Sequence, residues 1–176
     1  MVGAMDHQNQ QRSIDVLGQV RALRPLIEER AAAIEAQREL PQDLIEELRR
    51  CGVFRMYTPK SHGGLEYDLL DSLEVVTELT AADGSVGWVS MIGSATPCLL
   101  CGLPRTIFDT IYASTPEVIQ AGSTVPAGTA ERAEGGDRVT GRWPFASGCR
   151  HADWMVGLCV VTENGSSRPG PFRKPR

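Results

Sequence analysis

The chain has 176 residues, is 41% hydrophobic and 23% charged, and carries a formal net charge of −4. This composition is typical of a globular protein that folds as one domain, or slightly more, around a real core. An acidic balance gives no electrostatic reason to expect binding to nucleic acid or to an anionic membrane. The sequence has no run of about 18 apolar residues and begins with a polar, glutamine-rich stretch. We therefore expect a cytoplasmic protein that neither enters a membrane nor carries a signal peptide.

The cysteines give no sign of a disulfide framework or a metal site. Their number is odd and their spacing irregular, which argues against paired disulfides. Cys98 and Cys101 form a lone C-x-x-C pair without further ligands nearby, and zinc needs three or four. We expect all five to be buried free thiols: Cys51, Cys98, Cys101, Cys149 and Cys159.

Apolar residues recur at spacings of three and four through residues 13–114, which predicts about five helices. Residues 1–12 are expected to be a disordered tail. Ser13 can cap the first helix, which should end near Gln37 and be kinked or divided at Pro25. The other helices are expected from Leu40-Pro41 to a left-handed stop at Gly52, from Tyr67 or Asp68 to Asp83, from a Ser85 cap to Pro97, and from Pro104 to about Ser114.

A loop over residues 53–67 separates the second and third predicted helices and contains Pro59, Gly63 and Gly64. His62 lies beside the two glycines. A lone histidine in such a loop is usually solvated, and contact with a substrate is the alternative interpretation.

The pattern changes after residue 116. Residues 117–123, 129–133 and 138–143 are expected to be extended, the last two joined by a turn at Gly135-Gly136-Asp137. Residues 154–162 are almost continuously apolar, which is typical of a strand covered on both faces. Residues 163–176 are rich in proline, glycine and basic residues and are expected to be disordered.

The segment Gly141-Arg-Trp-Pro-Phe-Ala-Ser-Gly-Cys-Arg-His-Ala-Asp-Trp154 carries the main functional signal. If it is a strand, Phe145 and Ser147 share a face. They could then contact one flat heteroaromatic cofactor, by an apolar surface and by a hydrogen bond. The alternative is a structural hairpin with Phe145 in the core and Ser147 bonded to backbone.

This segment resembles the flavin-contacting strand of the acyl-CoA dehydrogenase family. Trp-Pro-Phe-Ala-Ser-Gly followed by His-Ala-Asp-Trp is most similar to the flavin-dependent monooxygenase branch, which includes the oxygenase components of two-component aromatic hydroxylases. The Leu-Pro start and Cys-Gly-Val-Phe exit of the second predicted helix also resemble the family, and the resemblance spans residues 23–162.

The resemblance implies an α+β protein: an N-terminal all-α helical domain, residues 13–116, followed by the beginning of a β-barrel-like middle domain, residues 117–162. The C-terminal four-helix bundle of the family would be absent, so the chain would be an N-terminal fragment, a truncated form. We expect such a fragment to be inactive alone. The family is homo-oligomeric, an assembly that a fragment can lose.

The resemblance also implies a bound reduced flavin, FAD or FMN. Ser147 is the first choice for a hydrogen bond near the reactive ring nitrogen and Ser123 the second, with Phe145 against the ring and Gly122 allowing close approach. For Ser123 the alternative is a hydroxyl that stabilises a turn.

On the fourth predicted helix, Trp88 and Thr96 are expected on the substrate side, with core packing as the alternative for Trp88. Thr96 stands where the branch often has a histidine, and threonine cannot act as a general base near neutral pH. This departure argues against a phenol-hydroxylating mechanism. The catalytic glutamate of acyl-CoA dehydrogenases belongs to the C-terminal domain, so no catalytic residue is assigned here.

Three functions follow from these observations. The first is a monooxygenase that hydroxylates a small organic substrate with oxygen and with reduced flavin supplied by a flavin reductase. The second is an FAD-dependent acyl-CoA dehydrogenase that oxidises an acyl thioester. The third is a truncated, non-catalytic remnant.

Overall fold

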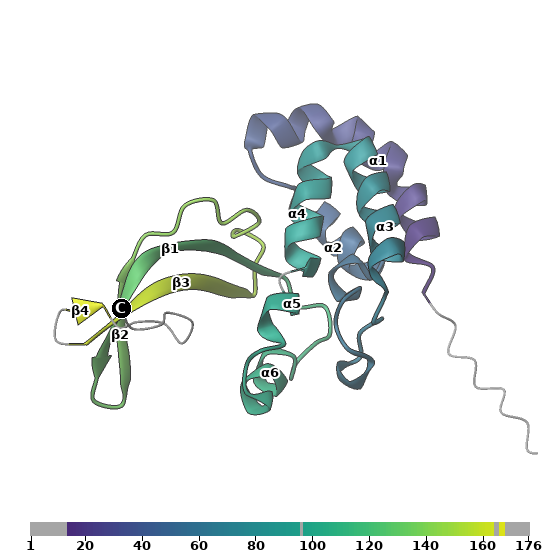
Figure 1. Cartoon of the computed structure of the whole chain (residues 1–176). Helices are drawn as coiled ribbons and strands as arrows, with labels where there is room; N and C mark the ends of the chain where they lie inside the picture. The colour runs from purple at the N-terminus through teal and green to yellow at the C-terminus, as the bar shows by residue number, and fades with distance from the viewer. Residues whose placement is uncertain (1–13, 96, 164–165, 168–176) are drawn as a thin grey trace, which may run out of the picture.

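The computed structural model describes residues 14–95, 97–163 and 166–167. Helices come first and a mixed sheet follows, so the α+β prediction is confirmed. Figure 1 shows the helices gathered on one side of the molecule and the sheet on the other. The predicted tail over residues 1–12 lies outside the described part. Of the predicted C-terminal tail, residues 166–167 form a short strand.

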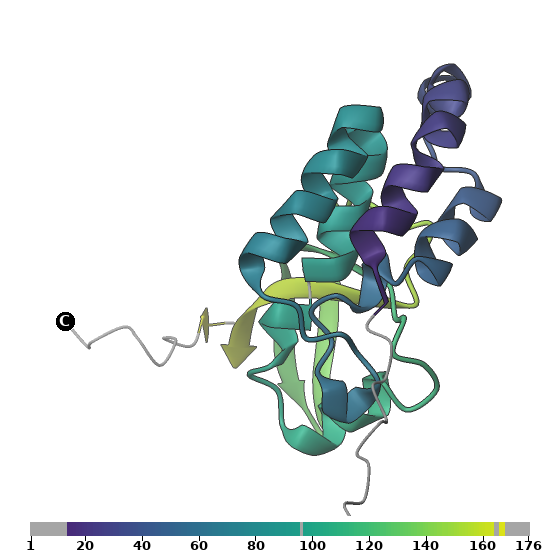
Figure 2. The same cartoon turned by 90° about the vertical axis from the view of Figure 1, so that its right-hand side faces the viewer.

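The helical part is built around one apolar cluster. Its helices are α1 (Val16–Gln37), α2 (Gln42–Arg50), α3 (Leu69–Ala82), α4 (Gly84–Ala95), α5 (Pro97–Leu100) and α6 (Arg105–Ile111), with 3-10 turns η1 (Val53–Arg55) and η2 (Lys60–His62). In both views α3 lies beside α4, and α1 lies beside α3 (Figures 1 and 2). The cluster buries the apolar stripe of α1, the inner face of α2, and Phe54 of η1. Burial of this kind is the main term that stabilises the helices.

Three local predictions about the helices can now be judged. Gly52 adopts a left-handed conformation at φ 85° and its N–H bonds to the carbonyl of Arg49, which confirms the predicted stop. Of the two alternatives predicted at Pro25, a kink or a division, the division is wrong, because α1 continues through it. The cap predicted at Ser85 is also wrong. Oδ1 of Asp83 accepts hydrogen bonds of 2.9 Å from the N–H groups of Ser85 and Val86, so Ser85 already lies inside the first turn.

The sheet has the strand order β2-β1-β3-β4. Its strands are β1 (Gln120–Ala133), β2 (Gly136–Gly141), β3 (Trp154–Glu163) and β4 (Ser166–Ser167). The predicted hairpin is confirmed, since β1 and β2 pair antiparallel around a turn at residues 134–135. In contrast, β3 pairs with β1 in parallel, beginning with Gln120 opposite Trp154.

Parallel strands require a crossover connection. Because β2 occupies the opposite edge of β1, residues 142–153 must cross the sheet to reach β3. β2 ends opposite Gly128, whereas β3 begins opposite Gln120, so the crossing runs toward the helical end of β1. We call residues 142–153 the crossing segment. Figure 1 shows it passing over β1 beside α4.

The crossing segment is not an extended strand, which was the first of the two interpretations of this stretch. β2 ends at Gly141, and residues 147–151 form a turn. Phe145 has a left-handed backbone, with φ 60°, and its side chain is 88% exposed. Phe145 and Ser147 therefore do not share a strand face. Pro144 is the third residue after β2. It has no N–H to donate to a neighbouring strand, which favours the end of strand pairing here.

The first part of the crossing segment is seated on the sheet by Trp143. Its indole lies over one glycine from each of three strands. A Cβ added to Gly128, Gly141 or Gly157 would lie 2.3, 3.0 or 2.8 Å from the ring. The indole Nε1 donates a 2.7 Å hydrogen bond to the carbonyl of Leu158. The glycines leave room for a flat ring that any side chain would displace.

β3 is not covered here, although an apolar run of this kind is typical of a covered strand. Most of its large apolar side chains are exposed: Trp154, Met155, Leu158, Val160 and Val161. An apolar run indicates that a strand can be buried, but the covering layer must come from elsewhere in the polypeptide, and no described element supplies it on these side chains.

The prediction of buried thiols holds only for Cys51, whose burial raises its pKa to about 11. Cys98, Cys101 and Cys149 are exposed and Cys159 is half-buried. Within the described residues, no cluster of histidine, cysteine or acidic side chains could hold a metal ion. No described helix is long and apolar enough to cross a membrane.

The glycine seat of Trp143 can be tested by adding one methyl group. Gly128→Ala should lower the free energy of unfolding by about 1–3 kcal/mol, the usual cost of overpacking, as measured by urea denaturation. Gly102→Ala is the matched control, because a Cβ at Gly102 meets no atom within 4 Å. In a Trp143→Ala background, Gly128→Ala should cause little further loss in the free energy of unfolding, because the indole that the added methyl group would meet is absent. Equal stability of the two glycine variants would contradict the seat.

Candidate functional site

The turn of the crossing segment forms one wall of a cavity of about 240 Å³. Residues 146–151 line that wall, Val89 of α4 faces them, and Arg38 and Glu39 of the α1–α2 connection complete the rim. The cavity therefore lies where the helical part and the sheet part meet. Ser147, the first choice for flavin contact, is among the lining residues and is half-buried.

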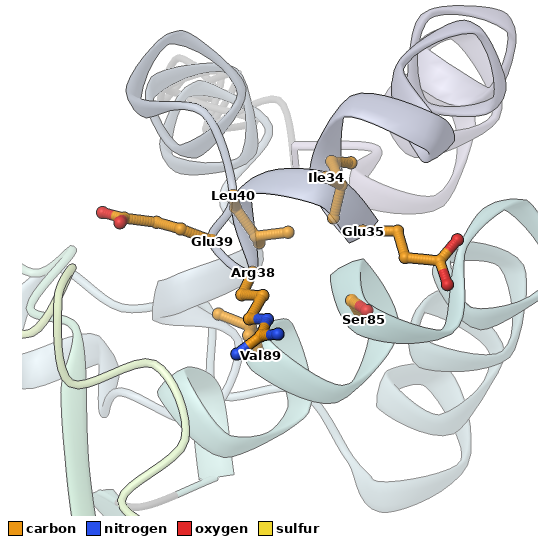
Figure 3. Close-up of a pocket in the computed structure, with 7 residues that line it drawn as sticks. All are labelled: Ile34, Glu35, Arg38, Glu39, Leu40, Ser85 and Val89. Atoms are coloured by element: carbon orange, nitrogen blue, oxygen red, sulfur yellow. The ribbon is translucent and has the colours of Figure 1, made fainter.

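A second cavity, of about 320 Å³, continues from the first along α4. The two share Arg38, Glu39 and Val89, and the second adds an apolar wall from Ile34 and Leu40. Figure 3 shows the Arg38 side chain reaching from the α1–α2 connection to Val89, whereas the carboxylates of Glu35 and Glu39 point away from it. Arg38 ends α1 in a left-handed conformation, φ 55°, and its N–H bonds back to two carbonyls of the last turn.

The turn lies close to both helical walls. Gly148 has φ 78°, and a Cβ there would reach van der Waals contact with Val89, 3.4 Å away. The Arg150 guanidinium bonds to the Glu39 carboxylate at 2.9 Å. Within the turn, the N–H of Cys149 bonds to the carbonyl of Ala146 at 3.1 Å. The cavity is thus bounded by a turn that has internal hydrogen bonds, an ion pair with Glu39 and a close approach to Val89.

The other residues predicted to contact flavin lie outside this lining. Phe145 is exposed. Ser123 is buried within β1, and its Oγ accepts a 3.3 Å hydrogen bond from the N–H of Val125, as expected for a hydroxyl that stabilises a turn. Gly122 allows tight strand packing, because a Cβ there would lie 2.3 Å from the Val156 carbonyl oxygen.

The predicted substrate-side residues on α4 have different outcomes. Trp88 is 54% exposed, so the core-packing alternative for it is wrong. Its neighbour Val89, which the sequence analysis did not select, is the α4 residue that lines both cavities. Thr96 lies outside the described residues.

His151 was missed by the sequence analysis, although it is part of the quoted motif. It lines the cavity, and its Nδ1 is buried without a hydrogen-bond partner in the described part of the chain. Burial lowers the pKa of the imidazole; Glu39 raises it, and Arg150 and Arg49 lower it further. The neutral form is therefore favoured, and a neutral imidazole can accept a proton. The signal that could have found it is a histidine four residues after Ser147.

His62 does not line this cavity, and the prediction that it is solvated is wrong. Its side chain is only 10% exposed. Nε2 lies 2.8 Å from Oδ1 of Asp109, and Nδ1 lies 2.9 Å from Oγ of Ser61. The imidazole ring also makes T-shaped contacts with the rings of Phe108 and Tyr112. His62 thus fastens η2 to α6, and the Arg105 guanidinium and His62 together lower the pKa of Asp109.

Comparison with known proteins identifies the helical part. The sequence profile of the acyl-CoA dehydrogenase N-terminal domain matches residues 20–102. The helical part is therefore similar to an acyl-CoA dehydrogenase N-terminal domain. The family resemblance inferred from the sequence is therefore confirmed.

Curated relatives of this chain are named as monooxygenases and hydroxylases, some of them flavin-dependent or FADH2-dependent by name. The chain is 40% identical over 141 residues to the indole-3-acetate monooxygenase of Acinetobacter baumannii, covering 78% of this chain and 36% of that protein. It is 32% identical over 158 residues to the oxygenase component of the FADH2-dependent resorcinol hydroxylase of a Rhizobium species, covering 90% of this chain and 39% of that protein. The chain thus spans somewhat over a third of the length of these relatives.

Solved structures agree with this relationship. The crystal structure of 3-HSA hydroxylase from Rhodococcus sp. RHA1 superposes with a TM-score of 0.83 at 30% identity, covering 88% of this chain and 41% of that one. XiaF from Streptomyces sp., in complex with FADH2 and glycerol, superposes with a TM-score of 0.84 at 28% identity, covering 89% and 39%. The chain is related to the oxygenases of two-component flavin-dependent monooxygenases.

The lowered pKa of His151 predicts a pH dependence of stability. Above the ordinary value of 6.5, the imidazole is neutral in both the folded and the unfolded state. Below it, the unfolded chain binds the proton more readily, so the free energy of unfolding should fall as the pH drops. Urea denaturation at pH 7.5 and at lower pH should show a smaller decrease for His151→Gln than for the unaltered chain. An identical decrease in both proteins would contradict burial of a neutral imidazole.

Proposed function

We propose that this chain provides the flavin-side wall of an oxygenase that hydroxylates a small organic substrate with reduced flavin and oxygen. The observation that carries the proposal is the position of Ser147, which lines a cavity between the crossing segment and α4 in a chain related to flavin-dependent oxygenases. The relatives' names make FADH2 the first flavin to test. Reduced FMN, the other flavin expected from the sequence, is the second. A flavin reductase is the partner that an oxygenase component requires.

The cavity offers suitable groups for this role. The Ser147 hydroxyl can hydrogen-bond to the flavin ring, and such a bond tunes a redox centre whose reaction with oxygen is the flavin's own. Val89, with Ile34 and Leu40 beyond it, supplies apolar surface that excludes water from a bound aromatic molecule. Ser123 remains the second candidate for a flavin hydrogen bond, and Trp88 a candidate for the substrate side.

The names of the relatives indicate the substrate class. Resorcinol and indole-3-acetate are small aromatic compounds, and each is the substrate named for a relative at least 32% identical to this chain. We infer an aromatic substrate of similar size. The neutral imidazole of His151 could accept a proton from such a substrate at the cavity wall.

Cys149 provides a reporter, because it is exposed and lines the cavity. In a chain with Cys98, Cys101 and Cys159 replaced by serine, a maleimide should react with Cys149 and leave buried Cys51 intact. Reduced FAD or FMN, added without oxygen, should slow this reaction. Ser147→Ala should weaken flavin binding by about 0.5–1.5 kcal/mol, the value of one hydrogen bond.

Ser85→Ala is the matched control for that measurement, since Ser85 lines the second cavity but does not belong to the crossing segment. It should bind flavin like the parent chain. If neither reduced flavin protects Cys149 at millimolar concentration, the chain alone does not hold flavin, as expected for a non-catalytic remnant.

A further inference from the structure

Asp153 ends the crossing segment at the point where the parallel ladder begins. Its N–H donates to the carbonyl of Ile119 at 2.8 Å, and its Oδ2 accepts from the N–H of Ile119, also at 2.8 Å. The next residues of each strand, Gln120 and Trp154, form the first pair of β1 with β3. Asp153 thus joins the end of the crossing segment to the residue before β1. Ile119 is fully buried in the helical core, so this junction has a fixed base.

Arg49 of α2 completes the junction from the helical side. Its Nη2 bonds to the same Oδ2 of Asp153 at 3.1 Å, and its Nη1 bonds to the carbonyl of Glu117 at 2.5 Å. The Arg49 side chain is 17% exposed and the Asp153 side chain is 43% exposed. The helix that carries it is anchored by Leu44, Ile45 and Leu48, all fully buried. Arg49 therefore connects a fixed helix to the segment before β1 and to the start of β3.

We propose that Arg49 and Asp153 are positioning residues for the cavity. They fix one end of the crossing segment, while Trp143 fixes the other, and the turn that carries Ser147 and His151 lies between these two points. The only other described ion pair of the crossing segment, Arg150 with Glu39, involves an arginine that is 73% exposed, and exposed pairs contribute little. The pair formed by Arg49 and Asp153 thus sets the distance of the turn from α4.

Two conservative variants separate this positioning role from a role in which the two side chains only fill space. Asp153→Asn keeps the shape and removes the charge, and Arg49→Lys keeps the charge but loses the planar fork that bonds two acceptors. Asp153→Asn should raise amide hydrogen exchange across residues 142–153 by about tenfold, because it weakens a charged hydrogen bond. Arg49→Lys should give an intermediate increase. In the double variant the effects should not multiply, because one interaction is lost.

Arg50→Lys is the matched control, since Arg50 is the next residue of α2 and forms an exposed pair with Glu47. It should stay within about twofold of the parent chain, as surface substitutions usually do. Exchange in α3 and α4 reports whether the fold persists. If Asp153→Asn also loses hydrogen-exchange protection in α3 and α4, the proposal is judged on Arg49→Lys alone. Rates in Arg49→Lys within about twofold of the parent chain, or multiplying effects, would overturn the proposal.

The link to flavin rests on the proposed function and has its own readout. Asp153→Asn should weaken flavin binding by about tenfold, while Asp153→Glu, which retains the carboxylate, should recover part of that loss. The hydrogen-exchange measurement needs no flavin. A chain that binds no flavin but shows the exchange changes would refute the proposed function and leave the positioning role intact. Unchanged flavin affinity in Asp153→Asn would refute the positioning role alone.

Discussion

The parallel pairing of β1 with β3 is the constraint on which the arrangement of the site depends. A hairpin between β1 and β2 uses one edge of β1, so the chain must cross the sheet before β3 can pair with the other edge. That crossing carries Ser147 and His151 to the end of the sheet nearest the helices. The crossing segment reaches the helical part because β1, which it follows back, begins directly after Ile119 of the helical core. There Gly93 of α4 leaves space for Phe54 and Ile119. The cavity is a consequence of topology, and neither half of the chain contains it alone.

Features that depend on neighbouring residues were predictable from the sequence. The stripes of α1 to α4, the left-handed stop at Gly52 and the hairpin turn beside Gly135 all follow from patterns within a few residues. The crossing was not predictable in this way, because it depends on a pairing between Ile119 and Asp153, which are 34 residues apart. The apolar run of β3 likewise shows a capacity for burial that only other parts of a polypeptide can satisfy. Local pattern was misleading where a second segment decided the outcome.

The same division applies to the site. Ser147 was selected through a family resemblance, and the structure places it in a cavity wall. Arg38, Glu39 and Val89 carry no local signal, since tertiary packing alone brings the end of α1 and the middle of α4 to the turn. His151 was visible in the motif, but its importance depends on a buried ring nitrogen without a partner, which no spacing reveals. Gly122 was selected through the same resemblance, but it does not line the cavity. Close packing against Val156 explains why a small residue is needed there.

Register connects the two serines that were predicted to contact flavin. Ser123 pairs with Gly157, and Gly157 is one of the three glycines beneath Trp143. The indole of Trp143 therefore lies over Gly157, the residue of β3 that pairs with Ser123. Ser147 follows Trp143 by four residues. An irregularity between Ser123 and Gly128 lets both ends of β1 pair with β3 despite unequal lengths of chain. A slip of one residue would reverse every side chain of β3 and place a bulky neighbour under the indole. The glycines of the three strands thus fix the starting point of the turn, and Arg49 with Asp153 fixes its end.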